Sequence, residues 1–283
     1  MARASSDALT RLGELCRGDG RRLDLLEAAL ALSELHRLAA GEAGPILLAP
    51  YRQQVAAMTA EVADLVRRRG ADPDRLAEVI ARTYAYRGDK ETYDDLQNAD
   101  LARVIERRKG LPVALSILYL HLARAQGWEA EGLAFPAHFL IRVDIEGARH
   151  VLDPFHEGAV REATELRQLL RQVLGPDAEP HPRHFDAVVD RDVLLRLENN
   201  VRLRLAQRED WAGSARSLER MLTIAPDRPE LLFEAGQLNA RLDKRRAAIA
   251  AFERFLNLQG EEGDPDLRRR ASALLQELRR GLN

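Results

Sequence analysis

The stretch that decides the fold is Leu111-Pro-Val-Ala-Leu-Ser-Ile-Leu-Tyr-Leu-His-Leu-Ala123, which follows Gly110. Pro112 suits the first turn of a helix, because the N–H that proline lacks would be unpaired there anyway. Almost every later position is apolar, so the predicted helix has no wide polar face. A helix of this kind belongs in the middle of a domain. The run is too short to cross a bilayer, which needs about 20 apolar residues.

The segments on either side of this helix differ in their hydrophobic period. Before it, apolar residues recur at helical spacing and predict helices in the segments 25–39, 55–69 and 101–109. After Gly127 come three strand-like runs, at 129–135, 138–144 and 148–153. The last two runs flank Glu146-Gly147, a pair typical of a tight hairpin turn. The sequence therefore predicts an α+β domain with helices first and an antiparallel sheet after them.

The second half of the chain has a different residue pattern from the first half. Residues 175–191 contain three prolines within Gly175–His184 and are interpreted as a linker. From 192 to 283 the pattern is helical, with Ala235-Gly236, Ala248, Phe252 and Phe255 at tetratricopeptide spacing. We expect three parts: a helical lead-in and α+β domain over 1–174, the linker over 175–191, and helical repeats with a capping helix over 192–283.

The amino-acid composition argues against several classes of protein. The chain has 283 residues, 46% hydrophobic and 31% charged, which argues against disorder. A formal net charge of −2 gives no support to a nucleic-acid partner. The single cysteine, Cys16, and the absence of a signal pattern at the N-terminus fit a cytoplasmic protein in a reducing compartment. We expect no membrane partner.

A candidate catalytic site lies around the central helix. Helix N-termini carry partial positive charge and suit a thiolate or an anion. His138 begins one predicted strand and Asp153 ends the next, so the hairpin brings them nearly opposite each other. A histidine and an aspartate beside a helix N-terminus form the layout of a Cys-His-Asp acyl-transfer site. A histidine at a strand start is also found as a satisfied interior residue.

These motifs resemble a known superfamily. The run from Gly110 to Tyr119, together with Ala137-His138-Phe139 and Leu152-Asp153-Pro154, is similar to the nucleophile, His and Asp segments of the transglutaminase-like superfamily. More narrowly, the chain resembles the bacterial invasion-regulator Sir B-type proteins. That resemblance rests on Tyr93-Asp94, Asn98, the segments 107–112 and 136–139, Asp153-Pro-Phe and Leu197-Glu-Asn-Asn. It implies a transglutaminase-like (papain-like) domain followed by an all-α tetratricopeptide-like domain.

One position departs from the superfamily pattern. Enzymes of the superfamily place a cysteine two residues after the glycine that opens the helix, and here that position is Pro112. The prediction is therefore a non-catalytic protein that binds a protein or peptide partner and has a regulatory role. The alternative is a hydrolase or acyl transferase that keeps the His138–Asp153 pair and uses water or Ser116 as nucleophile.

The candidate binding residues are Pro112, Ser116, Tyr93, Asp94, Asn98, Asn199 and Asn200. Several have simpler interpretations. Asn98 is a suitable N-cap for the helix at Leu101, Ser116 can bond back to a backbone carbonyl, and Tyr93 and Asp94 can belong to a solvated loop. His138 and His156 near Asp153 could capture a metal adventitiously. No histidine set shows an established ligand spacing, so we predict no metal. No Gly-rich phosphate loop or dinucleotide fingerprint is present in the sequence, so we predict no cofactor.

Overall fold

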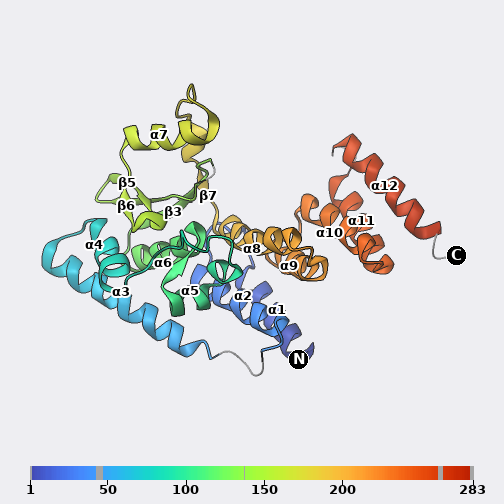
Figure 1. The fold of residues 1–283 in the computed structure, drawn as a ribbon, viewed down its shortest axis with the longest axis horizontal. Helices are drawn as coiled ribbons and strands as arrows, with labels where there is room; N and C mark the ends of the chain where they lie inside the picture. Colours follow the sequence, from blue (N-terminus) through green and yellow to red (C-terminus); the bar gives the residue numbers. More distant parts are fainter. Residues whose placement is uncertain (1, 43–46, 137, 261–263, 281–283) are drawn as a thin grey trace. The chain divides into compact units, whose positions relative to one another are not determined.

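The computed structural model describes residues 2–42, 47–136, 138–260 and 264–280 (Figure 1). The chain divides into two compact units, residues 1–197 and 198–283. The division falls inside helix α8 (Asp190–Gln207). Among the described residues, no helix is both long enough and apolar enough to cross a membrane.

Helix α6 (Pro112–Ala125) lies at the centre of the first unit, as its apolar sequence predicts (Figure 1). It packs against helices α2 (Leu25–Ala39), α3 (Ala49–Arg69) and α5 (Leu101–Arg107) and against the first strand of the sheet. The remaining helical elements before it are α1 (Ala2–Leu15), α4 (Asp74–Ala77), the π-helical turn η1 (Glu78–Thr83) and the 3₁₀ turn η2 (Leu96–Ala99).

A five-stranded antiparallel sheet follows α6 in the chain, in the order β6-β5-β4-β3-β7. Its hairpin turns at Glu146 and Gly147, whose φ angles of 51° and 86° are those of a type I′ turn, so the predicted turn is confirmed. The strands lie between α6 and helix α7 (Ala163–Leu174) (Figure 1). The strand bounds are β3 (Glu129–Leu133), β4 (Ile141–Ile145), β5 (Ala148–Asp153), β6 (Ala159–Val160) and β7 (Ala187–Val188).

Two short strands join the N-terminal side of α6 to the loop before η2. Strand β1 (Arg87–Gly88) pairs in parallel with β2 (Lys109–Gly110). A Cβ at Gly88 would lie 2.4 Å from the ring of Phe155, so only glycine fits at this position without displacing the ring. The loop after β5 is thereby held beside the segment that leads into α6.

The structure differs from the sequence-based expectation in two places that matter for the site. His138 does not begin a strand, because β4 starts three residues later at Ile141. The segment 175–191 is not a free linker. Its 3₁₀ turn η4 (Pro182–Phe185) leads into β7, which pairs with β3, and Phe185 packs against the apolar cluster under α7. Burial of these apolar side chains outweighs the turn-forming tendency of the prolines.

The described residues of the second unit comprise the C-terminal part of α8 and the helices α9 (Trp211–Ile224), α10 (Pro229–Arg241), α11 (Arg245–Gln259) and α12 (Pro265–Arg280). Phe233, Phe252 and Phe255 form its core together with residues of α12. A Cβ at Gly236 would lie 2.6 Å from the Phe252 ring, which explains the small residue in the predicted repeat. Helix α12 packs on α11.

Candidate functional site

Asp153 is the centre of the candidate site. It is fully buried at the end of β5 and caps the 3₁₀ turn η3 (Pro154–His156), where its Oδ1 accepts the backbone N–H of His156 at 3.2 Å. Its other oxygen, Oδ2, lies 3.0 Å from Nε2 of His138 and 2.8 Å from Nδ1 of His156. The same oxygen accepts two N–H groups of Arg161, at 2.8 and 3.1 Å. We call these four residues the Asp153 cluster.

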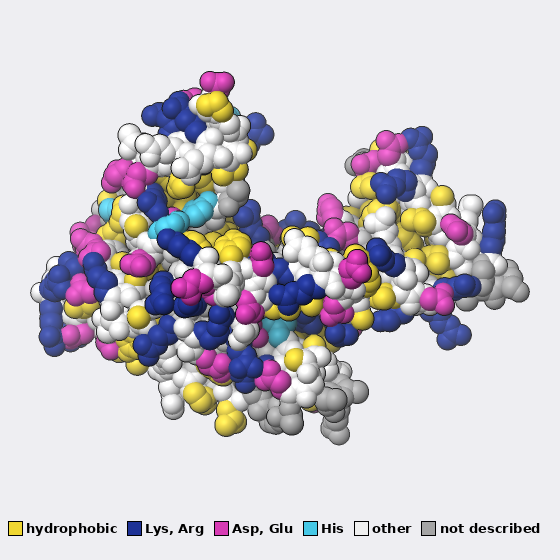
Figure 2. All heavy atoms as spheres, viewed as in Figure 1, with side chains coloured by type: hydrophobic (Ala, Val, Ile, Leu, Met, Phe, Trp, Pro, Cys, Tyr) yellow, Lys and Arg dark blue, Asp and Glu magenta, His cyan; other side chains and the backbone are white. Residues whose placement is uncertain are grey.

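The cluster reaches the surface through its histidines. The His138 and His156 rings stack with centroids 5.7 Å apart and planes 20° apart. Their side chains are 17% and 34% exposed, whereas Asp153 is not exposed at all. Histidine side chains gather at the surface of the first unit between α6 and α7 (Figure 2). Imidazole edges are therefore accessible from solvent while the carboxylate beneath them is not.

The charge of Asp153 is fixed by its neighbours. Burial alone would raise the pKa of this carboxyl, but hydrogen bonds from His138 and Arg161 and the nearby His156 hold it well below its usual range. Asp153 is therefore ionised at neutral pH. A carboxylate that accepts the N–H of an imidazole sets the tautomer and orientation of the ring, as in a general-base pair.

Neither Pro112 nor Ser116, the two candidate positions on α6, offers a free nucleophile to this pair. Pro112 occupies the first position of the helix, and Ser116 is fully buried and donates its hydroxyl to the carbonyl of Pro112 at 2.8 Å. This is the backbone-bonded arrangement common for helical serines. Cys16 lies just after α1 and is 3% exposed, and burial raises the pKa of its thiol to about 11. A neutral, enclosed thiol is a poor nucleophile.

A pocket of about 290 Å³ adjoins the cluster on the side of His156. Its walls come from the loop around β1, from β2 and from the turn after β5. Lys109 in this wall pairs with Glu91 at 2.8 Å. The lining residues are Arg87, Gly88, Asp89, Lys90, Glu91, Lys109, Phe155, His156 and Glu157.

The loop that carries Tyr93, Asp94 and Asn98 borders this region. Tyr93 is 45% exposed and meets Phe155 edge to face at 5.9 Å, and Asp94 is exposed next to it. Asn98 is buried; its amide donates to the carbonyl of Thr92 at 2.6 Å, and its oxygen accepts from Arg107 at 2.9 Å. Tyr93 and Asp94 are thus the exposed members of this set, and Asn98 supports the loop.

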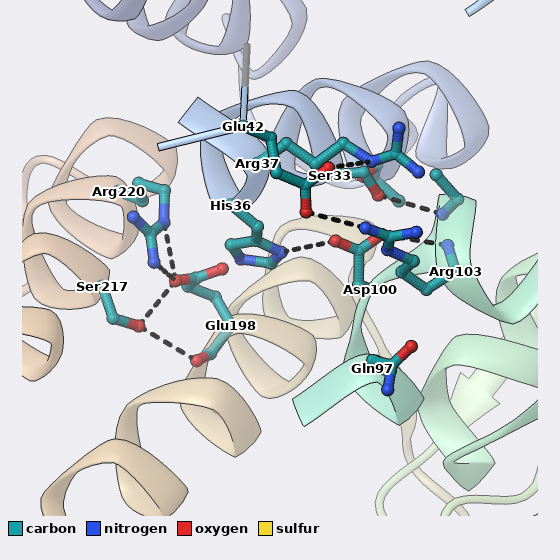
Figure 3. Close-up of polar contacts among 12 residues, drawn as sticks. Ser33, His36, Arg37, Glu42, Gln97, Asp100, Arg103, Glu198, Ser217 and Arg220 are labelled. Carbon is teal, nitrogen blue, oxygen red and sulfur yellow. Dashed lines mark hydrogen bonds and ion pairs between the residues drawn. The ribbon is translucent and has the colours of Figure 1, made fainter. Parts of the chain in front are cut away.

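The expectation that Asn98 caps the helix at Leu101 is wrong. Asp100 is the N-cap of α5: it accepts the backbone N–H of Arg103 at 3.1 Å and also lies 3.4 Å from Nδ1 of His36 (Figure 3). An ionised carboxylate interacts more favourably than an amide with the positive end of a helix. The side chain of Asn98 is already committed within its own loop.

Asn199 and Asn200 lie on α8, at the start of the second unit. The oxygen of Asn199 accepts from Arg202 at 2.9 Å, and that of Asn200 accepts from Arg204 at 2.8 Å. Both side chains are partly buried and bonded along their own helix.

Sequence reasoning missed Arg161 and gave His156 only a minor place. Arg161 lies eight residues after Asp153, where the last predicted strand ends, and nothing in its local sequence points to Asp153. His156 had a detectable signal, because it follows Asp153 by three residues across a proline-initiated turn. Ala137, which belongs to the motif around His138, lies outside the described residues.

Comparison with known proteins identifies the family. The sequence profile of the transglutaminase-like superfamily matches residues 49–199, more than half of the chain, and a tetratricopeptide repeat profile matches residues 201–276. The chain therefore belongs to the transglutaminase-like superfamily. The predicted α+β fold class followed by helical repeats is confirmed, and this pair of domains points to a role in protein interaction.

Curated relatives include bacterial proteins called UPF0162. The one from Xylella fastidiosa Temecula1 is 32% identical over 64% of this chain and 66% of its own length, so the match spans just under two thirds of that relative. The one from Vibrio cholerae is 30% identical over 86% of this chain and 88% of its own length. Mouse F-box only protein 21 is 30% identical over 60% of this chain but only 27% of its own length.

Among solved structures, menin matches with a TM-score of 0.40 and 9% identity, over 97% of this chain and 74% of that chain. This likeness is too distant to bear on fold or function.

Proposed function

We propose that the chain is a non-catalytic transglutaminase-like protein that binds a protein or peptide partner and acts as a regulator. The observation that carries the proposal is the residue at the start of α6. Pro112 stands where the superfamily nucleophile is expected, and Cys16 is enclosed elsewhere with a raised pKa. The surroundings of the lost nucleophile remain: a buried aspartate, an oriented histidine and an adjoining pocket.

The binding surface we propose is the pocket beside His156 together with Tyr93 at its rim. An exposed aromatic ring resting on a second ring offers apolar contact at low entropic cost. The lysine and carboxylate side chains of the pocket supply polar partners for a peptide backbone or side chain. The helical repeats of the second unit provide a second candidate surface, because stacked helical repeats commonly bind peptide segments.

Chemical assays test the non-catalytic assignment. Incubation with a primary amine donor and a glutamine-bearing acceptor is expected to give no amide product, before or after thiol alkylation. Thiol-sensitive product formation would overturn the proposal, since it would require Cys16 to act in the site.

Restoring a thiol tests the alignment behind the proposal. Pro112→Cys places a thiol at a helix N-terminus, where the pKa of a thiol falls. It should alkylate faster at neutral pH than Glu219→Cys, a thiol on the exposed side of α9. Equal rates would mean that residue 112 does not occupy the nucleophile position.

Partner capture tests the binding surface. The wild type and the variants Tyr93→Ala and His138→Ala are immobilised in parallel, with Glu219→Ala as the control. A specific protein retained by the wild type and the control but lost by Tyr93→Ala would support the surface. Retention by all four forms would place binding elsewhere.

A second function is favoured by one contact, the 3.0 Å hydrogen-bond distance between His138 and Asp153. In this alternative the pair activates water for hydrolysis of an amide or ester. Turnover of a panel of activated esters and peptides by the wild type that disappears in His138→Ala would favour the hydrolase. Equal background rates would exclude it.

We also assign the chain to the invasion-regulator Sir B-type group. The motifs around Tyr93, Asn98 and Asp153 in this chain support this assignment. Its transglutaminase-like domain followed by helical repeats supports it as well.

A further inference from the structure

We propose that His138, Asp153 and His156 bind a divalent transition-metal ion. Two imidazoles and one carboxylate are a ligand set that Zn²⁺, Fe²⁺ and Co²⁺ accept, with further positions left for water. The proposal concerns these three side chains and does not depend on whether the chain binds a peptide.

The ligand atoms are already close to the separations that one ion requires. Two ligand atoms each about 2.1 Å from a common metal lie about 3.0 to 3.4 Å apart in octahedral or tetrahedral geometry. Here Oδ2 of Asp153 lies 3.0 Å from Nε2 of His138 and 2.8 Å from Nδ1 of His156. All three atoms lie within 4.8 Å of one another.

Metal binding requires the N–H proton that each imidazole directs at Asp153 to move to another atom. Without an ion, each ring uses an N–H to contact Oδ2 of Asp153. A metal ligand must instead present a lone pair on that nitrogen, so the proton moves through solvent to the other nitrogen of the same ring. Each hydrogen bond to the carboxylate is then replaced by coordination to a shared ion, and neither ring changes its charge.

Arg161 is a cation that already pairs with Asp153, so an ion must bind beside a positive charge. When the two imidazoles stop donating to Oδ2, that oxygen can hold the ion while Arg161 remains as an outer hydrogen-bond donor. Arg161 is also held by Glu165 at 3.1 Å. Its positive charge opposes all divalent cations alike, so the discrimination against Mg²⁺ and Ca²⁺ comes from the two imidazoles, because these ions prefer oxygen ligands. Ions that gain from imidazole nitrogen are favoured instead.

The site has both a rigid base and an open side. The carboxylate is fully buried and fixed at the end of β5, where its other oxygen caps the turn η3. His138 and His156 are partly exposed, so an ion can enter from solvent and retain water ligands. A site with three protein ligands and open positions is the arrangement that activates water in metalloenzymes.

A second histidine pair provides a matched control. His181 and His184 also lie ring to ring, with centroids 6.0 Å apart, but both bond to the backbone of their own turn. In the part of the chain that the structure describes, one group of three side chains has ligand atoms close enough together to hold a metal ion: His138, Asp153 and His156. The double variant His181→Ala/His184→Ala should therefore leave metal binding unchanged.

The experiment titrates the intact chain, stripped with chelator, with Zn²⁺ and Co²⁺ by calorimetry and visible absorption, with Mg²⁺ and Ca²⁺ in parallel. The wild type and the control double variant should bind one equivalent of Zn²⁺ or Co²⁺, and Co²⁺ should give a visible d–d band. His138→Ala and His156→Ala should each bind at least about tenfold more weakly. Mg²⁺ and Ca²⁺ should produce no saturable heat.

Three outcomes would overturn the proposal. Absence of a stoichiometric Zn²⁺ or Co²⁺ site in the wild type would reject it. Unchanged affinity in both single variants would reject it as well, as would loss of binding in the control double variant. His156→Gln, together with circular dichroism of each variant, separates loss of a ligand from loss of the fold.

Discussion

Two fully buried carboxylates, one in each unit, have opposite surroundings. Asp153 in the first unit holds two histidines and an arginine that are 17%, 34% and 18% exposed. Glu198 in the second unit accepts from Arg220 at 2.7 and 2.8 Å and from Ser217 at 2.6 Å (Figure 3). Ser217 is not exposed and the side chain of Arg220 is only 6% exposed.

The difference separates a structural ion pair from a candidate site. Around Glu198, Ser217 and Arg220 are enclosed, so their contacts with the carboxylate stabilise the packing of α8 on α9 within the second unit. Around Asp153 the partners lead from the buried carboxylate to solvent, so their free edges can contact a ligand. Burial of an acid is common to both; exposure of its partners is the property that distinguishes them.

The largest effect is expected for Glu198→Ala. Removal of this carboxylate leaves the guanidinium of Arg220 buried without its anion, which typically costs about 3–5 kcal/mol. We expect a matching fall in the free energy of unfolding of the second unit, measured by urea denaturation. Glu219→Ala, an exposed position on α9, should change it by less than about 0.5 kcal/mol. A small effect of Glu198→Ala would mean that Arg220 reaches water. The partners of Glu198 would then be accessible to solvent, as those of Asp153 are.

An intermediate effect is expected for Asp89, a buried carboxylate of the first unit whose partner Arg107 is 26% exposed. Burial acts to raise the pKa of Asp89, but hydrogen bonds from Thr92 and Asn98 outweigh it and hold the pKa well below its usual range. A folded-state pKa below the unfolded value of about 3.9 adds stability above that pH and loses it as the pH falls through the folded value.

Urea denaturation of the full chain between pH 7 and pH 3 measures this contribution. Asp89→Asn should lower stability at pH 7 and flatten the decline between pH 5 and pH 3. The conservative change Asp94→Asn, at an exposed position of the same loop, serves as the control. Parallel curves for the wild type and Asp89→Asn would contradict the expected ionisation of Asp89.

The smallest effect on stability is expected for His156→Ala. Asp153 would still accept from His138 and from Arg161, so no charge is left unpaired. The loss should be about 1 kcal/mol or less, typical of one partly exposed hydrogen bond. Thermal and urea denaturation of the variant beside the wild type measure it. A loss as large as that of Glu198→Ala would make the Asp153 cluster a structural ion pair and remove the contrast between the units.

The elements that could be predicted were those with a strong local signal. The run of apolar residues after Pro112 indicated the central helix, Glu146-Gly147 indicated the hairpin, and the spacing of Gly236 and Phe252 indicated the helical repeat. Two adjacent strands joined by a short turn also fix approximately which residues face each other. The pairing of His138 with Asp153 was therefore within reach, although His138 lies before its strand.

The remaining features depend on contacts between distant segments. Asp100 rather than Asn98 caps α5, because the Asn98 side chain is used by Thr92 and Arg107, a competition that the local sequence does not display. The proline-containing segment joins the sheet through β7, because apolar surface of β3 and α7 is available to cover it.

The sequence by itself determined the fold class, the central helix and the helical repeats, because each follows from residue type and short-range spacing. It also shows directly that proline stands at position 112. Only the tertiary structure decided that Arg161 and His156 meet His138 on one oxygen of Asp153 and that this group opens to solvent. The physical reason is that burial and hydrogen bonding are properties of packed surfaces. Neither is defined until segments from α6, the sheet and the turn after β5 have come together.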